Sequence, residues 1–381
     1  MADASAYVKT NAEIQVYDDD VRAEDVAGQW QLMWWRFKRH KVAVIAGICV
    51  LFIYLVGIFA EFLSPMDPND HHTRYTYAPP QNVDLFHDGQ WLPHVKGYQV
   101  EIDQFTLRRT FVTDEEKIIP IGLFVKGDEY KMWGLIPWDR HLIGPLNPRD
   151  PFYLWGADRL GRDMLSRVIH GARVSMSIGL VGVAISLVLG IILGGISGYF
   201  GGWIDNAIQR IIEFLKSIPT IPLWMGLAAA IPLTWEPLYV YFAITVLISL
   251  IGWTGLAREV RGKVISMKGD DFVIAARLDG LRTNKIITRH LVPSFLSHII
   301  AQTTLAIPDM ILSETALSFL GIGLQPPIVS WGVLLKEAQN INAVATAPWL
   351  MIPGLAVVFA VLTLNFLGDG MRDAADPYSH H

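Results

Sequence analysis

The stretch VAVIAGICVLFIYLVGIFAEFL, residues 42–63, decides the class of fold. It carries one charged residue, Glu61, over a length that spans the ~30 Å hydrocarbon core of a bilayer as a helix. Basic residues precede it at Arg36, Lys38, Arg39 and Lys41. Because Lys and Arg beside a span stay on the cytoplasmic side, we expect residues 1–40 to be cytoplasmic. The polar stretch before the run is too long for a signal peptide, so we interpret the run as a membrane anchor.

Further apolar runs predict an all-α membrane protein with about six transmembrane helices. The runs are residues 174–197, 208–231, 238–256, 294–317 and 349–367. Hydrophobic residues make up 52% of the 381 residues and charged residues 18%, which is apolar for a soluble protein. An even number of spans places the C-terminus in the cytoplasm, with the N-terminus. The first turns of the third run are charged and are also compatible with a helix that lies in the interface.

These runs divide the chain into five segments. Residues 1–40 form a cytoplasmic tail with an interfacial amphipathic helix around its tryptophans, and residues 41–63 form the first transmembrane helix. Residues 64–165 form an extracytoplasmic insert, in which alternating apolar positions at 98–102 and near 123–125 predict β-strands. Residues 166–370 form the transmembrane core, which includes a loop at 258–293, and residues 371–381 form a cytoplasmic tail.

The loop at 258–293 carries the segment FVIAARLDGL, residues 272–281. About eight Lys and Arg lie between Arg258 and Arg289, which is typical of a cytoplasmic loop. At helical spacing Phe272, Ala275, Ala276 and Asp279 share one face, and Gly280 permits a sharp turn after them. These features predict a short helix that docks on another protein.

The segment resembles the Glu-Ala-Ala loop of ABC-importer permeases. The alanine pair is Ala275-Ala276, the glycine is Gly280, and Leu291-Val292-Pro293 is the later element, whereas Ile274 stands in place of the glutamate. In that family the loop forms a coupling helix that docks on the ATP-hydrolysing subunit. The resemblance implies a docking surface of Phe272, Ala275, Ala276, Leu278 and Gly280, with Arg277 and Arg282 as its polar rim.

Four more blocks resemble the dipeptide and oligopeptide branch of these permeases, and within it the C-type subunit. They are LGRDMLSRVI with GAR at 160–173, GYFGG at 198–202 with Asp205, residues 314–332, and NFLGDGMRD with Asp376-Pro377. The resemblance implies a type I ABC-importer permease fold in a bacterial inner membrane. It also implies a second homologous permease, two ABC ATPase subunits that bind ATP and Mg, and an extracytoplasmic solute-binding protein. The chain itself is expected to catalyse nothing and to hold no cofactor, metal or nucleic acid.

The second apolar run carries a stripe of small residues. Gly182, Ser186, Gly190, Gly194 and Gly198 recur every four residues and so fall along one face of a helix. Small side chains let a neighbouring helix approach closely in a membrane. The pattern is compatible with a well-packed bundle and with a helix that moves against its neighbour.

Charges and prolines inside the predicted spans mark candidate pathway or gate positions. Pro219 and Pro222 should kink or break the third span, because proline lacks the N–H that continues a helix. Asp309 and Glu314 lie late in the fifth span, where charged groups face protein or a water-filled path. Either carboxylate is compatible with a structural hydrogen bond within the bundle and with a contact to solute.

Three other functions remain compatible with the sequence. The same scaffold imports oligosaccharides in some relatives, so the solute is open. An ion-coupled secondary transporter that uses Asp309 or Glu213 as a proton site would work without ATPases, and a membrane receptor would carry no solute. The sequence contains no Walker pattern and no catalytic signature. Cys49 is the single cysteine, so no disulfide forms within the chain.

Overall fold

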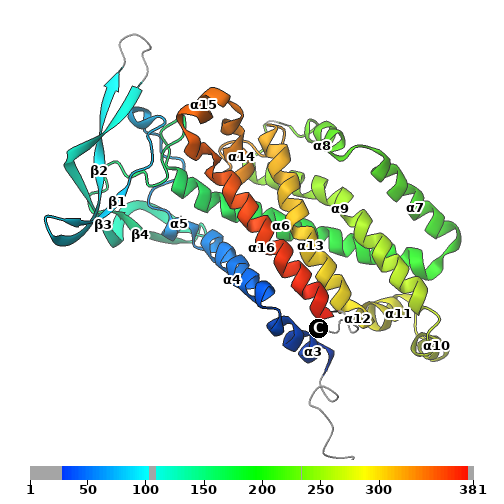
Figure 1. The fold of residues 1–381 in the computed structure, drawn as a ribbon. Helices are drawn as coiled ribbons and strands as arrows, with labels where there is room; N and C mark the ends of the chain where they lie inside the picture. Colours follow the sequence, from blue (N-terminus) through cyan, green and yellow to red (C-terminus); the bar gives the residue numbers. More distant parts are fainter. Residues whose placement is uncertain (1–27, 103–108, 233, 376–381) are drawn as a thin grey trace, which may run out of the picture.

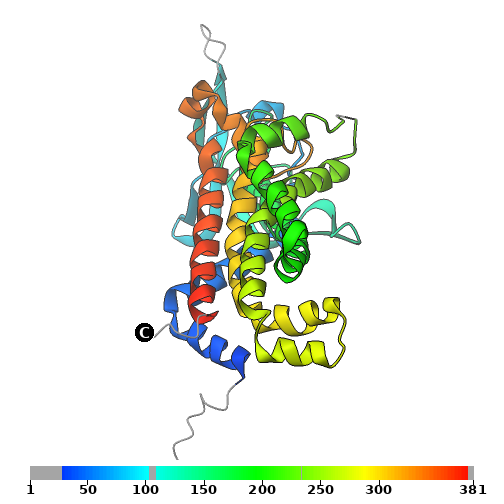
Figure 2. The same cartoon turned by 90° about the vertical axis from the view of Figure 1, so that its right-hand side faces the viewer.

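The computed structural model describes residues 28–102, 109–232 and 234–375 (Figures 1 and 2). Residues 1–27 of the expected cytoplasmic tail, and residues 376–381 at the other end, lie outside the described residues. The helices are α3 (Gln29–Arg39), α4 (Lys41–Ile58), α5 (Ala60–Leu63), α6 (Met164–Phe200), α7 (Gly202–Ser217), α8 (Thr220–Ala228), α9 (Pro237–Met267), α10 (Asp271–Leu278), α11 (Thr283–Ile286), α12 (Val292–Ser294), α13 (Leu296–Phe319), α14 (Trp331–Leu335), α15 (Ile341–Thr346) and α16 (Ile352–Ala375).

The expected fold class is confirmed. Among the described residues, α4, α6, α9 and the segment 348–375 that contains α16 are long and apolar enough to cross a membrane. Two bent helix pairs, α7 with α8 and the segment 283–294 with α13, bring the total to as many as six spans. The expected number of about six spans therefore corresponds to four continuous helices and two bent ones.

Several helices extend beyond the apolar runs that predict them. Helix α6 begins at Met164, ten residues before the run at 174–197, and α9 continues to Met267 although its run ends at 256. Helix α16 continues to Ala375, past the boundary expected at residue 370. Hydropathy marks only where a span leaves the hydrocarbon. The helix itself continues through the charged turns until its backbone hydrogen bonds end.

The third span breaks where its prolines predict. Helices α7 and α8 meet at an angle of 90°. Helix α7 ends at Ser217, Ile218 is extended, and Pro219 is the residue that precedes α8. Pro222 lies in the first turn of α8, where its missing N–H costs no helical hydrogen bond.

The insert at 64–165 contains the expected strands. β1 (Val83–His87), β2 (Gln90–Ile102), β3 (Arg109–Met132) and β4 (Ile136–Pro145) form one antiparallel sheet in the order β1-β2-β3-β4. The long strand β3 pairs with β2 along its first half and with β4 along its second half. Figure 1 shows the sheet and α15 at one end of the helical bundle, and α3, α10 and the end of α16 at the other.

Candidate functional site

The candidate coupling helix α10 stands beyond the end of the bundle (Figure 2). Asp270 precedes it, and Gly280 follows it with a φ of +73°, a conformation that glycine adopts without a Cβ clash. Val273 is fully buried against a cluster that includes Val260 and Val264 of α9. Packing of this kind holds α10 firmly on the extended end of α9.

Three large apolar side chains of α10 are exposed, together with the charged residues Asp271 and Arg277. Leu278 is 83% exposed, Ile274 is 43% exposed and Phe272 is 39% exposed. Residues 271, 274, 275 and 278 follow the helical spacing of one face, so Ile274 lies on the same side as Ala275 and Leu278. Ile274, which stands in place of the family's glutamate, therefore adds to the exposed apolar surface.

One residue expected on this docking surface is turned inward. Ala276 is 4% exposed and packs in the same cluster as Val273 and Ile286. The sequence prediction placed it outside because its spacing from Phe272 fits one helical face, and that spacing does not show which face meets the rest of the chain. Arg277 is exposed and lies over the ring of Tyr199 at the end of α6, 5.6 Å from the ring centroid, and Arg282 is exposed after the turn.

The stripe of small residues on α6 lies against α9. Gly182, Ser186, Gly190, Gly194 and Gly198 are all buried. A Cβ atom on Gly194 would lie 2.5 Å from the carbonyl oxygen of Ala257, and one on Gly198 would lie 2.8 Å from that of Arg261. Ser249 Oγ donates to the Gly182 carbonyl at 3.0 Å, and Ser186 Oγ donates to the Ser249 carbonyl at 3.2 Å. Glycine is therefore required where the two backbones touch.

Asp205, which follows the block GYFGG, joins three helices near the end of the bundle that carries α10. Arg261 of α9 donates to both of its carboxylate oxygens, at 2.6 and 2.5 Å, and Ser197 of α6 donates to it at 2.5 Å. A bidentate arginine–carboxylate pair fixes orientation as well as distance. This contact links α7 to the α6–α9 pair on the side that carries α10.

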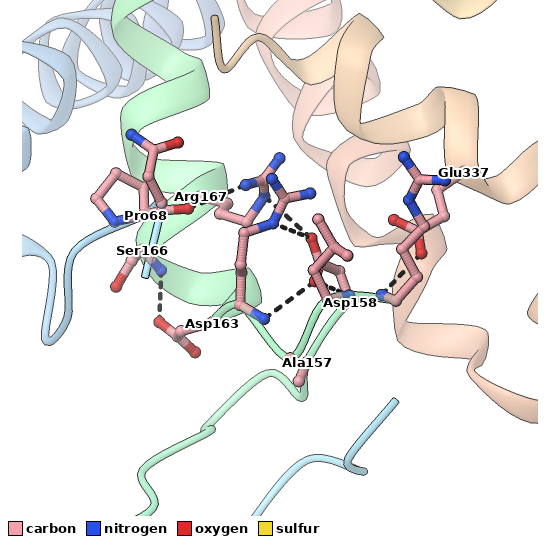
Figure 3. Close-up of polar contacts among 12 residues, drawn as sticks. Pro68, Ala157, Asp158, Asp163, Ser166, Arg167 and Glu337 are labelled. Atoms are coloured by element: carbon pink, nitrogen blue, oxygen red, sulfur yellow. Dashed lines mark hydrogen bonds and ion pairs between the residues drawn. The ribbon is translucent and has the colours of Figure 1, made fainter. Parts of the chain in front are cut away.

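A buried charged cluster lies at the other end of α6 (Figure 3). Asp158 is 1% exposed and accepts hydrogen bonds from Leu160 N at 2.8 Å, Arg162 N at 3.0 Å and Arg162 Nε at 2.7 Å. Arg167 Nε lies 3.6 Å from Asp158, and Arg167 Nη1 donates to the Pro68 carbonyl at 2.9 Å. The backbone N–H of Arg159 donates to Glu337 at 2.8 Å. The cluster therefore fastens both the insert and the segment before α15 to the start of α6.

The residues of the block LGRD each have a place in this cluster. Gly161 has a φ of +72°, and a Cβ there would lie 2.0 Å from the His72 carbonyl oxygen, so no other residue fits. Asp163 caps α6 by accepting a hydrogen bond from Ser166 N at 2.7 Å. Burial raises the pKa of the Asp163 carboxyl to about 6.

Glu314 lies at the centre of a second buried network. It is fully buried and accepts hydrogen bonds from Ser175 of α6 at 3.3 Å, Ser318 of α13 at 2.8 Å and Ser330 at 2.7 Å. Each serine oxygen in turn accepts a backbone N–H, from Trp331, Leu324 and Val333 respectively. Glu314 thus holds the loop between α13 and α14. Of the two roles that the sequence left open for this carboxylate, a structural hydrogen bond and a contact to solute, the structure shows the first.

Asp309 has a different environment five residues earlier. Its side chain is exposed in the middle of α13, directly after Pro308, which is buried inside the helix. It lines a cavity of about 220 Å³ together with Glu259 of α9 and Gln302. Of the four candidate pathway or gate residues, Glu314 is enclosed within the chain, Pro219 and Pro222 form the break of the third span, and Asp309 faces open space.

Sequence reasoning missed the partners of these two networks. Asp158 and Arg162 are four residues apart in a loop, where that spacing does not indicate a pair, and Arg167 and Glu337 join the cluster only through the fold. Ser175 and Ser330 are 155 residues apart and meet only through the fold. Arg167, which lies inside the block at 160–169, was the one available signal, since a guanidinium next to an apolar run demands a partner.

Comparison with known proteins finds family models, solved structures and curated relatives that are similar to this chain. Residues 187–379 match the family model "Binding-protein-dependent transport system inner membrane component", and residues 28–80 match "N-terminal TM domain of oligopeptide transport permease C". An inward-facing structure of the MetNI methionine ABC transporter is similar over 56% of this chain and 98% of that one, with 15% identity and a TM-score of 0.44.

Curated relatives match over most of their length. The dipeptide transport system permease protein DppC of Lactococcus lactis is 32% identical over 91% of this chain and 90% of its own. DppC of Alkalihalophilus pseudofirmus is 38% identical over 58% of this chain and 71% of its own, and the oligopeptide permease protein OppC of Haemophilus influenzae is 36% identical over 63% and 75%. The chain therefore belongs to the inner-membrane components of binding-protein-dependent transport systems, in the branch of the dipeptide and oligopeptide permeases.

Proposed function

We propose that this chain and a second homologous permease enclose a pathway for a peptide-like solute. An extracytoplasmic binding protein delivers the solute, and two ATPase subunits dock in the cytoplasm and hydrolyse ATP with Mg on their own sites. Both termini are cytoplasmic in this proposal, in keeping with the position of α3 and the end of α16 at the same end of the bundle as α10. The names of the dipeptide and oligopeptide permeases among the relatives support the choice of solute.

The apolar face of α10 is the observation that carries the proposal. Leu278 is 83% exposed at the end of α10, whose buried residues Val273 and Ala276 pack against the rest of the chain. An exposed leucine beside exposed Ile274 on the same face is costly in water and favourable when a partner covers it. A cleft on an ATPase subunit is the partner that the family resemblance implies.

The packing also supports a path for motion from α10 into the membrane. Val273 joins α10 to Val260 and Val264 of α9, and α9 meets α6 in direct backbone contact at Gly194 and Gly198. Closely packed elements of this kind move together, because interiors transmit displacement with little compression. A displacement of α10 would therefore move α9 and α6 as one body, which is the two-state element that coupling requires.

Asp309 fits a water-filled pathway between two permeases. A carboxylate in the middle of a span is stabilised by water or by protein, not by lipid. Its exposed side chain and the cavity shared with Glu259 favour a position on the solute path. At the other end of the molecule, a groove of about 870 Å³ between the segment 73–79, the start of β3 and helix α15 is our candidate contact for the binding protein.

Reconstituted transport tests the proposal. The chain would be placed in proteoliposomes with its second permease, ATPase subunits and loaded binding protein, and uptake of labelled dipeptides and oligosaccharides would be measured with and without ATP. We expect ATP-dependent uptake of peptides. Uptake driven by a proton gradient without ATPases would instead establish a secondary transporter, and uptake of oligosaccharides alone would correct the solute.

A matched pair of variants, compared by their binding of the ATPase subunits, tests the docking surface. Leu278→Ser removes an apolar contact of about 2 kcal/mol, which corresponds to roughly 30-fold weaker ATPase binding. Asn284→Ser changes an exposed residue of the same loop after the turn and should leave binding unchanged. Equal ATPase binding by the two variants would contradict docking through α10.

A further inference from the structure

The hairpin formed by β3 and β4 carries an apolar surface outside the helical bundle. Its large apolar side chains are Leu123 (73% exposed), Phe124 (58%), Trp133 (48%), Leu135 (78%), Ile136 (50%) and Trp138 (46%), and we call them the hairpin patch. Several large exposed apolar side chains on one hairpin mark a surface that something apolar covers. Neither the coupling helix nor the groove beside α15 includes any of these residues.

The hairpin patch is attached to the outer end of the first span. Trp133 Nε1 donates a hydrogen bond to the carbonyl of Ile58, the last residue of α4, at 2.8 Å. The Trp133 ring lies 6.0 Å from that of Phe59 between centroids, and Phe62 of α5 lies 5.8 Å from Phe124 and 6.2 Å from Trp138. Figure 1 shows β4 beside α5 at the end of α4 that is remote from α3.

The length and charge of α4 place that end at the membrane boundary. Its 18 residues span about 27 Å, close to the thickness of the hydrocarbon core. Basic residues precede α4 and place its start in the cytoplasm, so Ile58 lies at the outward boundary. Arg173 donates to the carbonyls of Gly57 and Ile58 at 2.7 and 3.0 Å and pairs with Glu61, as expected of charged side chains at the level of the headgroups.

The turn of the hairpin holds its tryptophan at a conformational cost. Trp133 has a φ of +54° and Gly134 a φ of +72°, so the first two of the three residues that connect β3 to β4 are left-handed. Asn or Gly is the usual first residue of such a turn, because a bulky side chain disfavours the left-handed conformation. A tryptophan kept at this position indicates that its indole ring has a role, and the bond to Ile58 shows where that ring is held.

We propose that the hairpin patch lies in the outward leaflet of the bilayer and that lipid covers it. Tryptophan and phenylalanine rings at the end of a span form the aromatic belt typical of the membrane interface, and here the insert adds rings to the belt of α4. Lipid is favoured over a protein partner because the patch is continuous with the lipid-facing side of α4, where Ile48, Phe52 and Ile58 are exposed. The insert is thus anchored to the membrane at one edge, and this holds whatever the solute.

Fluorescence quenching by lipids tests the proposal. Cys49→Ala removes the single cysteine, and Leu135→Cys or Ile136→Cys then takes an environment-sensitive label in the full chain, reconstituted in phosphatidylcholine nanodiscs with or without its partner subunits. Glu101→Cys, exposed near the outer tip of β2, is the control. We expect lipids with a nitroxide high on the acyl chain to remove most of the emission at 135 and 136 and almost none at 101.

Two results would overturn the proposal. Emission at 135 and 136 typical of water, and unquenched as at 101, would place the hairpin off the membrane. Emission typical of an apolar site that the lipid nitroxide does not quench would show that protein covers the patch. Leu135 is an exposed turn residue and Ile136 the exposed first residue of β4, so failure of one variant to fold leaves the other to decide.

Discussion

A single methyl group at Gly194 tests how α6 meets α9. The Cβ atom of Gly194→Ala would lie 2.5 Å from the Ala257 carbonyl oxygen and 3.0 Å from the Ala257 Cα. The nearer of these atoms belongs to the backbone, so no side-chain rotation relieves the contact. Helix α9 must move away, and the bonds between Ser249 and Gly182 are strained with it.

The expected cost follows from two opposing effects. Overpacking of a filled interior by a methyl group costs about 1–3 kcal/mol. Alanine favours a helix over glycine by about 1 kcal/mol. Gly262→Ala on α9 gives the second effect alone, because nothing lies within 4 Å of a Cβ there. The difference in unfolding free energy between the two variants therefore isolates the clash, at about 1–3 kcal/mol.

The assay is unfolding of the purified chain in mixed micelles at increasing SDS, followed by uptake in proteoliposomes. Gly194→Ala should unfold at lower SDS than Gly262→Ala, and Gly194→Leu should fail to assemble or to transport. Equal stability of the two alanine variants, or normal transport by Gly194→Leu, would refute the argument that backbone contact at Gly194 is needed.

Three further predictions concern the buried polar groups. Glu314→Ala leaves three serine hydroxyls without their acceptor and should lower the unfolding free energy by about 2–4 kcal/mol; a loss below 1 kcal/mol in SDS titration would contradict the network. Asp158→Ala leaves two arginines unpaired and should cost about 3–5 kcal/mol, seen as a lower melting temperature, whereas an unchanged one would show the cluster to be dispensable. Burial raises the pKa of Asp163 to about 6, so its neutral form is favoured in the folded state. The stability that this neutral carboxyl contributes is complete below pH ~4 and is lost as pH rises through 6. Asp163→Asn keeps the cap oxygen and should flatten the stability profile between those values; an unchanged slope would assign it to other groups.

The sequence was sufficient wherever a local pattern decides the structure. The apolar run at 42–63 predicts α4, the prolines at 219 and 222 predict the break between α7 and α8, and the alternation near 98–102 predicts strand β2. Spacing of four predicts that Gly182 to Gly198 lie on one face. Each of these signals depends on hydropathy, on a missing N–H or on a missing Cβ, all of which are properties of the residues themselves.

The remainder depends on contacts that only the fold creates. Helical spacing groups Ala276 with Phe272, yet the packing of α10 on α9 turns Ala276 inward and leaves Leu278 outside. Glu314 and Asp309 are alike in the sequence, but three serines from separate segments enclose the first, while the second faces a cavity. Likewise, nothing in the strands of the insert predicts that Trp133 reaches back to Ile58.

Crosslinking from α10 tests the coupling account most directly. A photoreactive amino acid at position 278 would be illuminated in membranes that contain the complete transporter, with position 284 as the matched exposed control, and the adducts identified by mass spectrometry. The account predicts a crosslink from 278 to a subunit that carries a Walker motif, of lower yield when ATP changes the docked geometry, and no such crosslink from 284. Crosslinks from 278 to lipid or to no ATPase, in membranes where the ATPase subunits are present and active, would contradict docking through α10.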